Sequence, residues 1–174
     1  GLSESNMPFN LPELLTPLAS ARYQQIYFAG EFAPLTGPQP ITRIPFRPDS
    51  SLGTAFSELF SNIQVRLSTR VGALSTTFSD NLIGGVVVFS GTPSLALSSS
   101  NTGLAGEPQD FDIVIELQTP FPYQPSDGNL ALDIQNFSGK ATTTFNAVFT
   151  GVPTLATGHI SANNVANTTA ETGS

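Results

Sequence analysis

The sequence predicts an all-β protein, a jelly-roll-like antiparallel β-sandwich with extended N- and C-terminal arms. Several short segments alternate apolar and polar residues with a period of two, which is typical of strands with one buried face. The connections between them draw on 14 prolines and 15 glycines, which favour turns. No segment shows the periodicity of a long amphipathic helix, so we expect seven to nine short strands in one domain.

The clearest strand pattern lies in residues 111–134. Apolar residues occupy every second position from 111 to 117 and again from 130 to 134. Between these runs, Pro120, Pro122 and Pro125 interrupt a strand ladder, and the sequence Ser-Asp-Gly-Asn provides turn chemistry. The segment therefore predicts two antiparallel strands that form a hairpin with a wide turn.

The other expected strands are shorter. They lie at residues 22–28, 41–47, 63–68, 82–89, 95–97 and 141–149. Pro45 favours an edge strand or a bulge in the second of these segments. Phe56, Leu59 and Phe60 recur at helix-like spacing instead, which predicts one short helical turn.

The two ends of the chain differ from the central domain, residues 21–157. Residues 1–20 contain three prolines, which exclude a long helix and predict an extended arm. The arm also has apolar side chains that need a surface, on their own domain or on a neighbouring subunit. These expected assembly residues are Phe9, Leu11, Leu14, Leu15 and Leu18.

The C-terminal segment, residues 158–174, is small and polar. Its apolar residues are few, so by itself it would be a disordered tail. Such a segment becomes ordered by pairing, either as an added strand of its own sheet or against another molecule.

The composition excludes several classes of partner. Charged residues make up 11% of the chain, about half the usual share, so the polar surface is built from Ser, Thr, Asn and Gln. Lys140 is the only lysine and the net charge is −7, which argues against nucleic acid and anionic membranes. Cysteine is absent, which excludes disulfides and thiolate metal sites. We also expect no membrane span and a signal peptide already removed.

No catalytic motif stands out, and we expect that the protein is not an enzyme. The sequence has no HExxH, GxSxG, P-loop or GxGxxG motif, and the single histidine, His159, has no acid near it in sequence. Asp110, Asp112 and Glu116 would share one strand face, with Asp133 opposite. Such carboxylates support glycoside hydrolysis if two face one cleft, but a solvated strand face is the simpler interpretation.

Two kinds of ligand site remain as alternatives. Asp110, Asp112, Asp127 and Asn129 lie near loops and offer the oxygen ligands that calcium prefers, so they are the candidate calcium residues. No other cofactor is expected. A glycan platform would usually contain tryptophan, which this chain lacks, and its only tyrosines lie at positions 23, 27 and 123.

A set of strand and turn sequences extends over about residues 7–134. These are RYQQIY at 22–27, ITRIPFRPD at 41–49, IQVRLST at 63–69, FSDN at 78–81, and FDI, PFPY and GNLALDI within 111–134. They resemble a group of bacterial secreted β-proteins that often carry a PEP-CTERM surface-sorting tail. The resemblance implies export to a bacterial envelope or extracellular matrix and brings no catalytic signature. The Pro-Glu-Pro motif of the tail and its apolar span are not in this chain.

Two functional hypotheses follow. The first is an extracellular structural protein, the subunit of a filament, sheath or biofilm-matrix homopolymer that assembles by strand addition. We favour the N-terminal arm as donor because of its apolar side chains. The alternative is a monomeric cell-surface binding module that recognises a glycan or a protein. The expected partners are further copies of the chain and extracellular polysaccharide.

Overall fold

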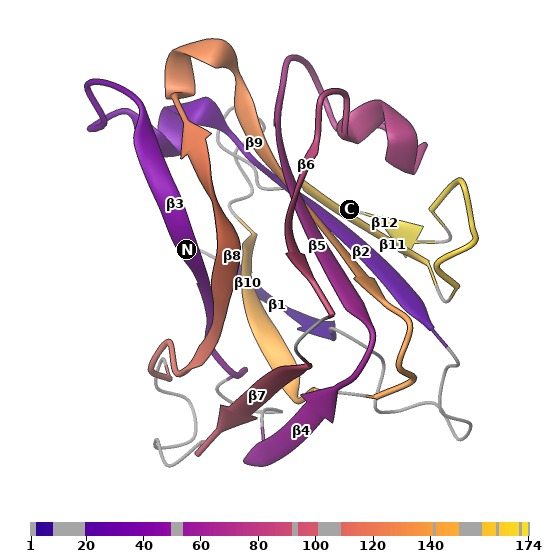
Figure 1. Ribbon diagram of the computed structural model, residues 1–174. Helices are drawn as coiled ribbons and strands as arrows, with labels where there is room; N and C mark the ends of the chain where they lie inside the picture. The colour runs from indigo at the N-terminus through magenta and orange to yellow at the C-terminus, as the bar shows by residue number, and fades with distance from the viewer. Residues whose placement is uncertain are drawn as a thin grey trace.

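The strands of the chain were located in a computed structural model, which describes residues 3–8, 20–49, 54–91, 94–100, 109–140, 142–149, 158–162, 164–170 and 172–173. Within these residues it forms strands and three short 3-10 helices (Figure 1), which confirms the all-β class. The strands are β1 (Ser3–Pro8), β2 (Ala21–Tyr27), β3 (Gln39–Phe46), β4 (Phe56–Phe60), β5 (Ile63–Arg70), β6 (Val86–Ser90), β7 (Leu95–Ser99), β8 (Ile113–Tyr123), β9 (Asn129–Asn136), β10 (Thr144–Phe149), β11 (Gly158–Ala162) and β12 (Thr172–Gly173). The 3-10 helices are η1 (Ala29–Phe32), η2 (Phe78–Asn81) and η3 (Pro125–Asp127).

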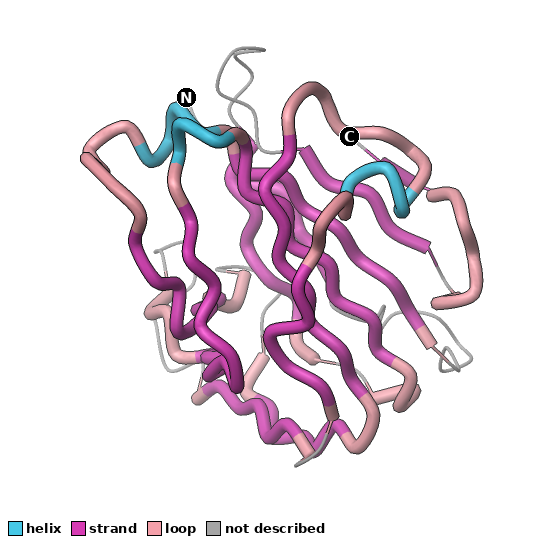
Figure 2. The backbone as a smooth tube through the Cα atoms, turned by 45° about the horizontal axis from the view of Figure 1, so that its top comes forward, coloured by secondary structure: helices cyan, strands magenta, loops and turns pink. Residues whose placement is uncertain are grey.

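The largest element is a six-stranded sheet in the order β12-β11-β2-β9-β5-β6, and all its pairs are antiparallel. Figure 2 shows these strands side by side. β9 lies inside the sheet because it pairs with β2 on one side and β5 on the other. The described residues also form three two-stranded sheets, β3–β8, β4–β7 and β1–β10.

The main core lies between one face of the six-stranded sheet, here called the inner face, and the β3–β8 and β4–β7 ribbons. Its buried side chains come from alternate positions of each strand, such as Leu132 and Ile134 of β9 and Ile113 and Ile115 of β8. Burying one such side chain contributes about 1.5–3 kcal/mol. The period-2 pattern of the sequence therefore identifies this face. The jelly-roll connectivity stays a prediction.

Residues 111–134 form two strands as predicted, but the predicted hairpin is wrong. β8 pairs with β3, whereas β9 pairs with β2 and β5. The reason lies in the connection between β8 and β9. There, η3 and Gly128, which has φ +135°, lead the chain from the β3–β8 ribbon into the six-stranded sheet. β8 also continues through two prolines. Pro120 lies in residues 117–120, which bulge opposite Thr42, where no ladder donor is needed, and Pro122 lies directly opposite Pro40 of β3.

The helical turn predicted at residues 56–60 is also wrong, since this segment is strand β4. It pairs with β7 along its whole length, and its exposure alternates as a strand requires. Phe60 is buried while Leu59 is 57% exposed. Pairing with a partner distant in sequence has overridden the local spacing.

Both ends of the chain contribute strands. β1 pairs with β10 over six residues, and the assembly residues proposed for the N-terminal arm, 9–18, lie outside the described residues. The polar C-terminal segment is ordered by strand addition to its own sheet, the first of the two expected alternatives, because β11 pairs with β2. Residues 158–162 therefore belong to the sheet of the central domain and are not a separate tail.

Candidate functional site

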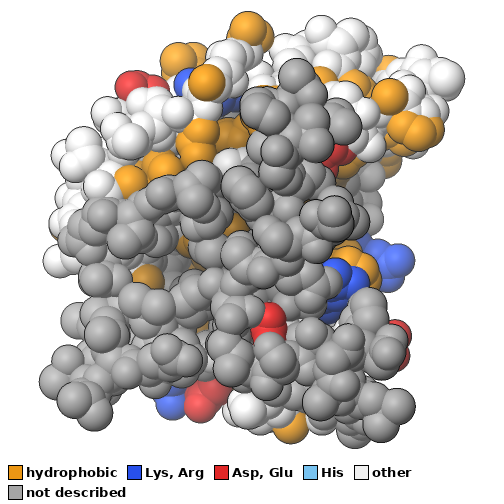
Figure 3. All heavy atoms as spheres, turned by 180° about the vertical axis from the view of Figure 1, so that it is seen from behind, with side chains coloured by type: hydrophobic (Ala, Val, Ile, Leu, Met, Phe, Trp, Pro, Cys, Tyr) orange, Lys and Arg blue, Asp and Glu red, His pale blue; other side chains and the backbone are white. Residues whose placement is uncertain are grey.

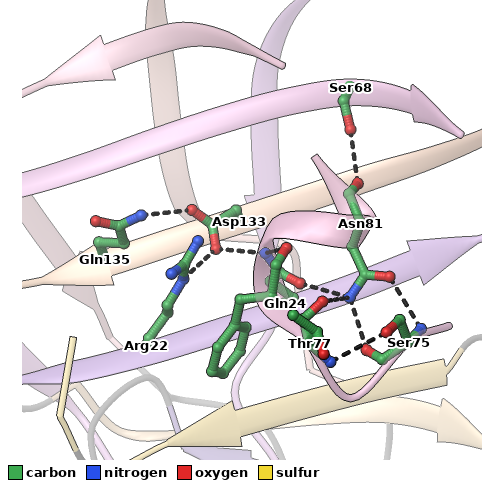
Figure 4. A network of polar contacts seen from close by, with 9 residues as sticks. Arg22, Gln24, Ser68, Ser75, Thr77, Asn81, Asp133 and Gln135 are labelled. Carbon is green, nitrogen blue, oxygen red and sulfur yellow. Dashed lines mark hydrogen bonds and ion pairs between the residues drawn. The ribbon is translucent and has the colours of Figure 1, made fainter. Parts of the chain in front are cut away.

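The outer face of the six-stranded sheet, turned away from the main core, holds a cluster of hydrogen-bonded polar side chains. Gln24 of β2, Asp133 of β9 and Arg66 of β5 stand directly opposite one another in the ladder. Since side chains alternate along a strand, Asp133 points outward while its neighbours Leu132 and Ile134 point into the core. We call the cluster of Arg22, Gln24, Ser68, Ser75, Asn81, Asp133 and Gln135 the polar network (Figure 4).

Asp133 is the charged centre of the polar network and is fully buried. Its Oδ1 accepts hydrogen bonds from Arg22 Nε and Gln24 Nε2, both at 2.8 Å. Its Oδ2 accepts one from Gln135 Nε2 at 2.9 Å. The Arg22 guanidinium neutralises the carboxylate. A buried carboxylate with this many donors is held in a fixed position.

Asn81 attaches η2 to the sheet. Its Nδ2 donates to Gln24 Oε1 and to the Ser75 carbonyl, both at 2.8 Å, and its Oδ1 accepts from Ser75 N–H at 2.9 Å. Its own carbonyl accepts a hydrogen bond from Ser68 Oγ at 2.9 Å. Gln24 also donates to the Phe78 carbonyl at 3.1 Å. The network therefore holds the connection between β5 and β6 against the outer face.

A second, smaller apolar cluster lies next to the network. Phe78 of η2, Ile160 and Ala162 of β11 are all buried there, and Leu74 and Ala170 pack against them. Arg22 Cζ lies 4.5 Å from the centroid of the Phe78 ring, a cation–π contact. Backbone hydrogen bonds from Phe78 N–H to the Thr168 carbonyl and from Ala170 N–H to the Thr76 carbonyl close the C-terminal segment over η2.

The carboxylates considered for hydrolysis are not brought together. Asp133 lies on the outer face, and the main core lies between it and β8. Asp112 Oδ2 accepts hydrogen bonds from Ser99 Oγ at 2.9 Å and from Ser100 N–H at 3.0 Å. Glu116 is exposed on β8, opposite Arg43. Asp112 therefore caps the end of β7 and does not pair with Asp133.

The four calcium candidates separate into two pairs. Asp110 and Asp112 precede β8, whereas Asp127 and Asn129 follow it, so an eleven-residue strand lies between the pairs. Asn129 Oδ1 accepts a hydrogen bond from Ala29 N–H at 3.0 Å. Across the part of the chain that the structure describes, no group of three or more His, Asp or Glu residues is arranged to hold a metal.

The tyrosines are packing residues and do not form an aromatic platform. Tyr23 and Tyr123 are buried, and Phe32 packs edge-on against Tyr123 and Tyr27, with ring centroids 5.0 and 6.5 Å apart. Burial raises the pKa of each tyrosine above 10.0, and Glu31 raises the pKa of Tyr27 and Tyr123 further. Burial likewise raises the pKa of Glu31, although its hydrogen bond from Phe28 N–H lowers it.

Comparisons with protein-family models, with curated proteins and with solved structures give no match to this chain. Among the described helices, none has the length and apolar character needed to cross a membrane. The resemblance to secreted proteins with a PEP-CTERM tail stays a prediction.

Proposed function

We propose that this protein is an extracellular structural protein, a homopolymer subunit of a filament, sheath or biofilm matrix. Its copies would assemble when a terminal strand of one adds to a sheet of the next. The proposal rests on one observation: β1 and β11, near the two ends of the chain, both enter sheets by pairing with strands far away in sequence. β1 pairs with β10, and β11 pairs with β2. Main-chain hydrogen bonds of this kind can form equally well between copies.

The surface of the molecule supports close packing between copies. Charged residues are few in the sequence, and on the described part of the back surface Figure 3 shows only small, separate groups of red and blue side chains. Repulsion between neighbouring copies is weak where charges are sparse. The polar network supports a structural role as well, since its carboxylate is buried and fully bonded.

The test is negative-stain electron microscopy with light scattering on the full chain and on two variants, one lacking residues 1–20 and one lacking 158–174. Filaments of the full chain that disappear in one truncation would support strand addition and identify the donor. Circular dichroism checks that each truncated chain is folded. Folded monomers of the full chain at every concentration would overturn the proposal.

A further inference from the structure

We propose that β11 is the strand exchanged between copies and that its acceptor is the edge of β2 together with the Phe78 cluster. This inference rests on the proposed function and names the donor, the acceptor and the partner, which is a second copy of the chain. It departs from the expectation that the N-terminal arm donates.

The acceptor edge belongs to β2. One side of β2 pairs with β9 over seven residues, while the other side takes β11 through five pairs, from Gly158 opposite Ile26 to Ala162 opposite Arg22. When β11 is absent, these residues of β2 become a sheet edge with unpaired N–H and C=O groups. Such an edge readily pairs with a strand from another chain.

Alternate side chains of β11 belong to the apolar cluster around Phe78. Ile160 and Ala162 are both 3% exposed and pack against Phe78, which is fully buried. A strand that combines ladder hydrogen bonds with pockets for every second side chain is the usual arrangement of strand addition. Because both side chains are buried in this cluster, we expect it to accept aliphatic residues at these two positions and to exclude charged ones.

Contacts outside β11 connect the elements of the acceptor. Asn81 bonds to Gln24, Gln24 bonds to the Phe78 carbonyl and Arg22 pairs with Asp133, so β2, β9 and η2 are joined to one another. The segment that follows β11 also bonds to η2, from Phe78 N–H to the Thr168 carbonyl and from Ala170 N–H to the Thr76 carbonyl, so it would accompany β11 in an exchange. β11 from the same chain and β11 from a second copy would make identical contacts.

Concentration decides which source is used. Pairing within one copy does not depend on the protein concentration, whereas pairing between copies increases with it, and effective concentrations within one chain are typically on the order of millimolar. Exchange between copies therefore becomes favourable in a crowded matrix and not in dilute solution. Each copy has one donor and one acceptor, so a head-to-tail exchange grows into an open chain, while a reciprocal exchange closes a dimer.

The experiment uses paired cysteines, because the natural chain has none to interfere. Gln25→Cys with His159→Cys places two thiols directly opposite each other in β2 and β11. Oxidation followed by non-reducing electrophoresis then distinguishes pairing within a copy from pairing between copies. We expect cross-linked monomer at micromolar concentration and a ladder of multimers as the concentration approaches the millimolar range.

Two matched pairs serve as controls. Ser57→Cys with Ser98→Cys lies in the β4–β7 ribbon, where both positions are exposed, and should give cross-linked monomer at every concentration. Asn6→Cys with Asn146→Cys reports on β1 and β10. An added peptide of residues 158–174 should suppress the β11 ladder several-fold, and the same peptide with Ile160→Asp should not.

The outcomes separate this inference from the proposed function. Cross-linked multimers from the β2–β11 cysteine pair alone support both the assignment to β11 and the proposed function. Filaments with a ladder from the β1–β10 pair alone overturn the assignment to β11 and keep strand addition. Filaments with no ladder from either pair overturn the assignment to β11 and leave assembly by another contact. No filaments and no ladder at any concentration overturn both.

Discussion

The inner and outer faces of the six-stranded sheet are built on different physical principles. The inner face is apolar, and Leu132 and Ile134 bury there against the two ribbons. The outer face is polar, and it is closed by an ion pair, amide hydrogen bonds and the small Phe78 cluster. Burial of apolar area has no direction, whereas hydrogen bonds require particular partners. The outer face therefore specifies which segments may cover the sheet, and the inner face supplies most of the stabilising burial.

The sharpest test of this comparison uses two adjacent residues of β9. Asp133→Ala should lower the free energy of unfolding by about 3–5 kcal/mol, because it leaves the Arg22 charge with no carboxylate partner on the outer face. Leu132→Ala should cost about 2–5 kcal/mol through a cavity on the inner face. Urea denaturation followed by circular dichroism measures both. Only Asp133→Ala should also speed limited proteolysis of residues 71–85.

Asp127→Ala is the control for the loss of a carboxylate, since Asp127 is exposed in η3. It should change stability by less than about 0.5 kcal/mol. A loss below about 1 kcal/mol in Asp133→Ala would show that the outer face does not depend on this ion pair.

The free energy of unfolding should be almost as sensitive to a substitution at Gly128, where the chain passes from the β3–β8 ribbon to the six-stranded sheet. Gly128 has φ +135°, and a Cβ atom at this position would lie 2.5 Å from the carbonyl oxygen of Arg70 on β5. Gly128→Ala should therefore cost about 2–3 kcal/mol, because the backbone conformation and the contact both resist a side chain. Gly37→Ala is the matched control, since open space surrounds its Cβ position. Equal thermal midpoints for the two variants would contradict the prediction.

A smaller and more local effect is expected for Asn81. Asn81→Ala removes the contacts to Gln24 and Ser75, so we expect a loss of about 1–3 kcal/mol. Hydrogen exchange should become faster in η2 and β11, while β8 and β9 keep their protection. Ser79→Ala, at an exposed position of the same helix, should leave exchange unchanged. Uniformly faster exchange would mean that the outer cover is not a separate unit.

The smallest effect concerns pH and appears only in alkaline solution. The pKa values of the three tyrosines are raised above 10.0 in the folded protein, so the folded state holds their protons more tightly than the unfolded state. This stabilisation is complete below about pH 10 and is lost as the pH rises through the folded pKa values. Near-ultraviolet titration should show phenolate forming in urea near pH 10 and only at higher pH in the folded chain. Phenolate formation near pH 10 in the folded chain would contradict the burial of these side chains.

The amino-acid sequence by itself determined the all-β class and the positions of strands such as β2, β5, β7 and β9. The physical reason is that successive side chains of a strand point to opposite faces, so a strand with one buried face has apolar residues at every second position. The bulge around Pro120 and the strand at residues 56–60 were missed because ladder pairing with β3 and β7 decides them.

Only the tertiary structure decided the partners of the strands and the composition of the polar network. Gln24 meets Asn81 across 57 positions of sequence and Asp133 across 109, and no local pattern links residues so far apart. Nothing in the local sequence of residues 78–81 indicates that Asn81 attaches η2 to the sheet. The calcium candidates failed to converge for the same reason, since β8 carries Asp112 and Asp127 to opposite ends of one strand. Local periodicity shows which face is buried, while register and layer order arise from contacts that form only when the whole chain has folded.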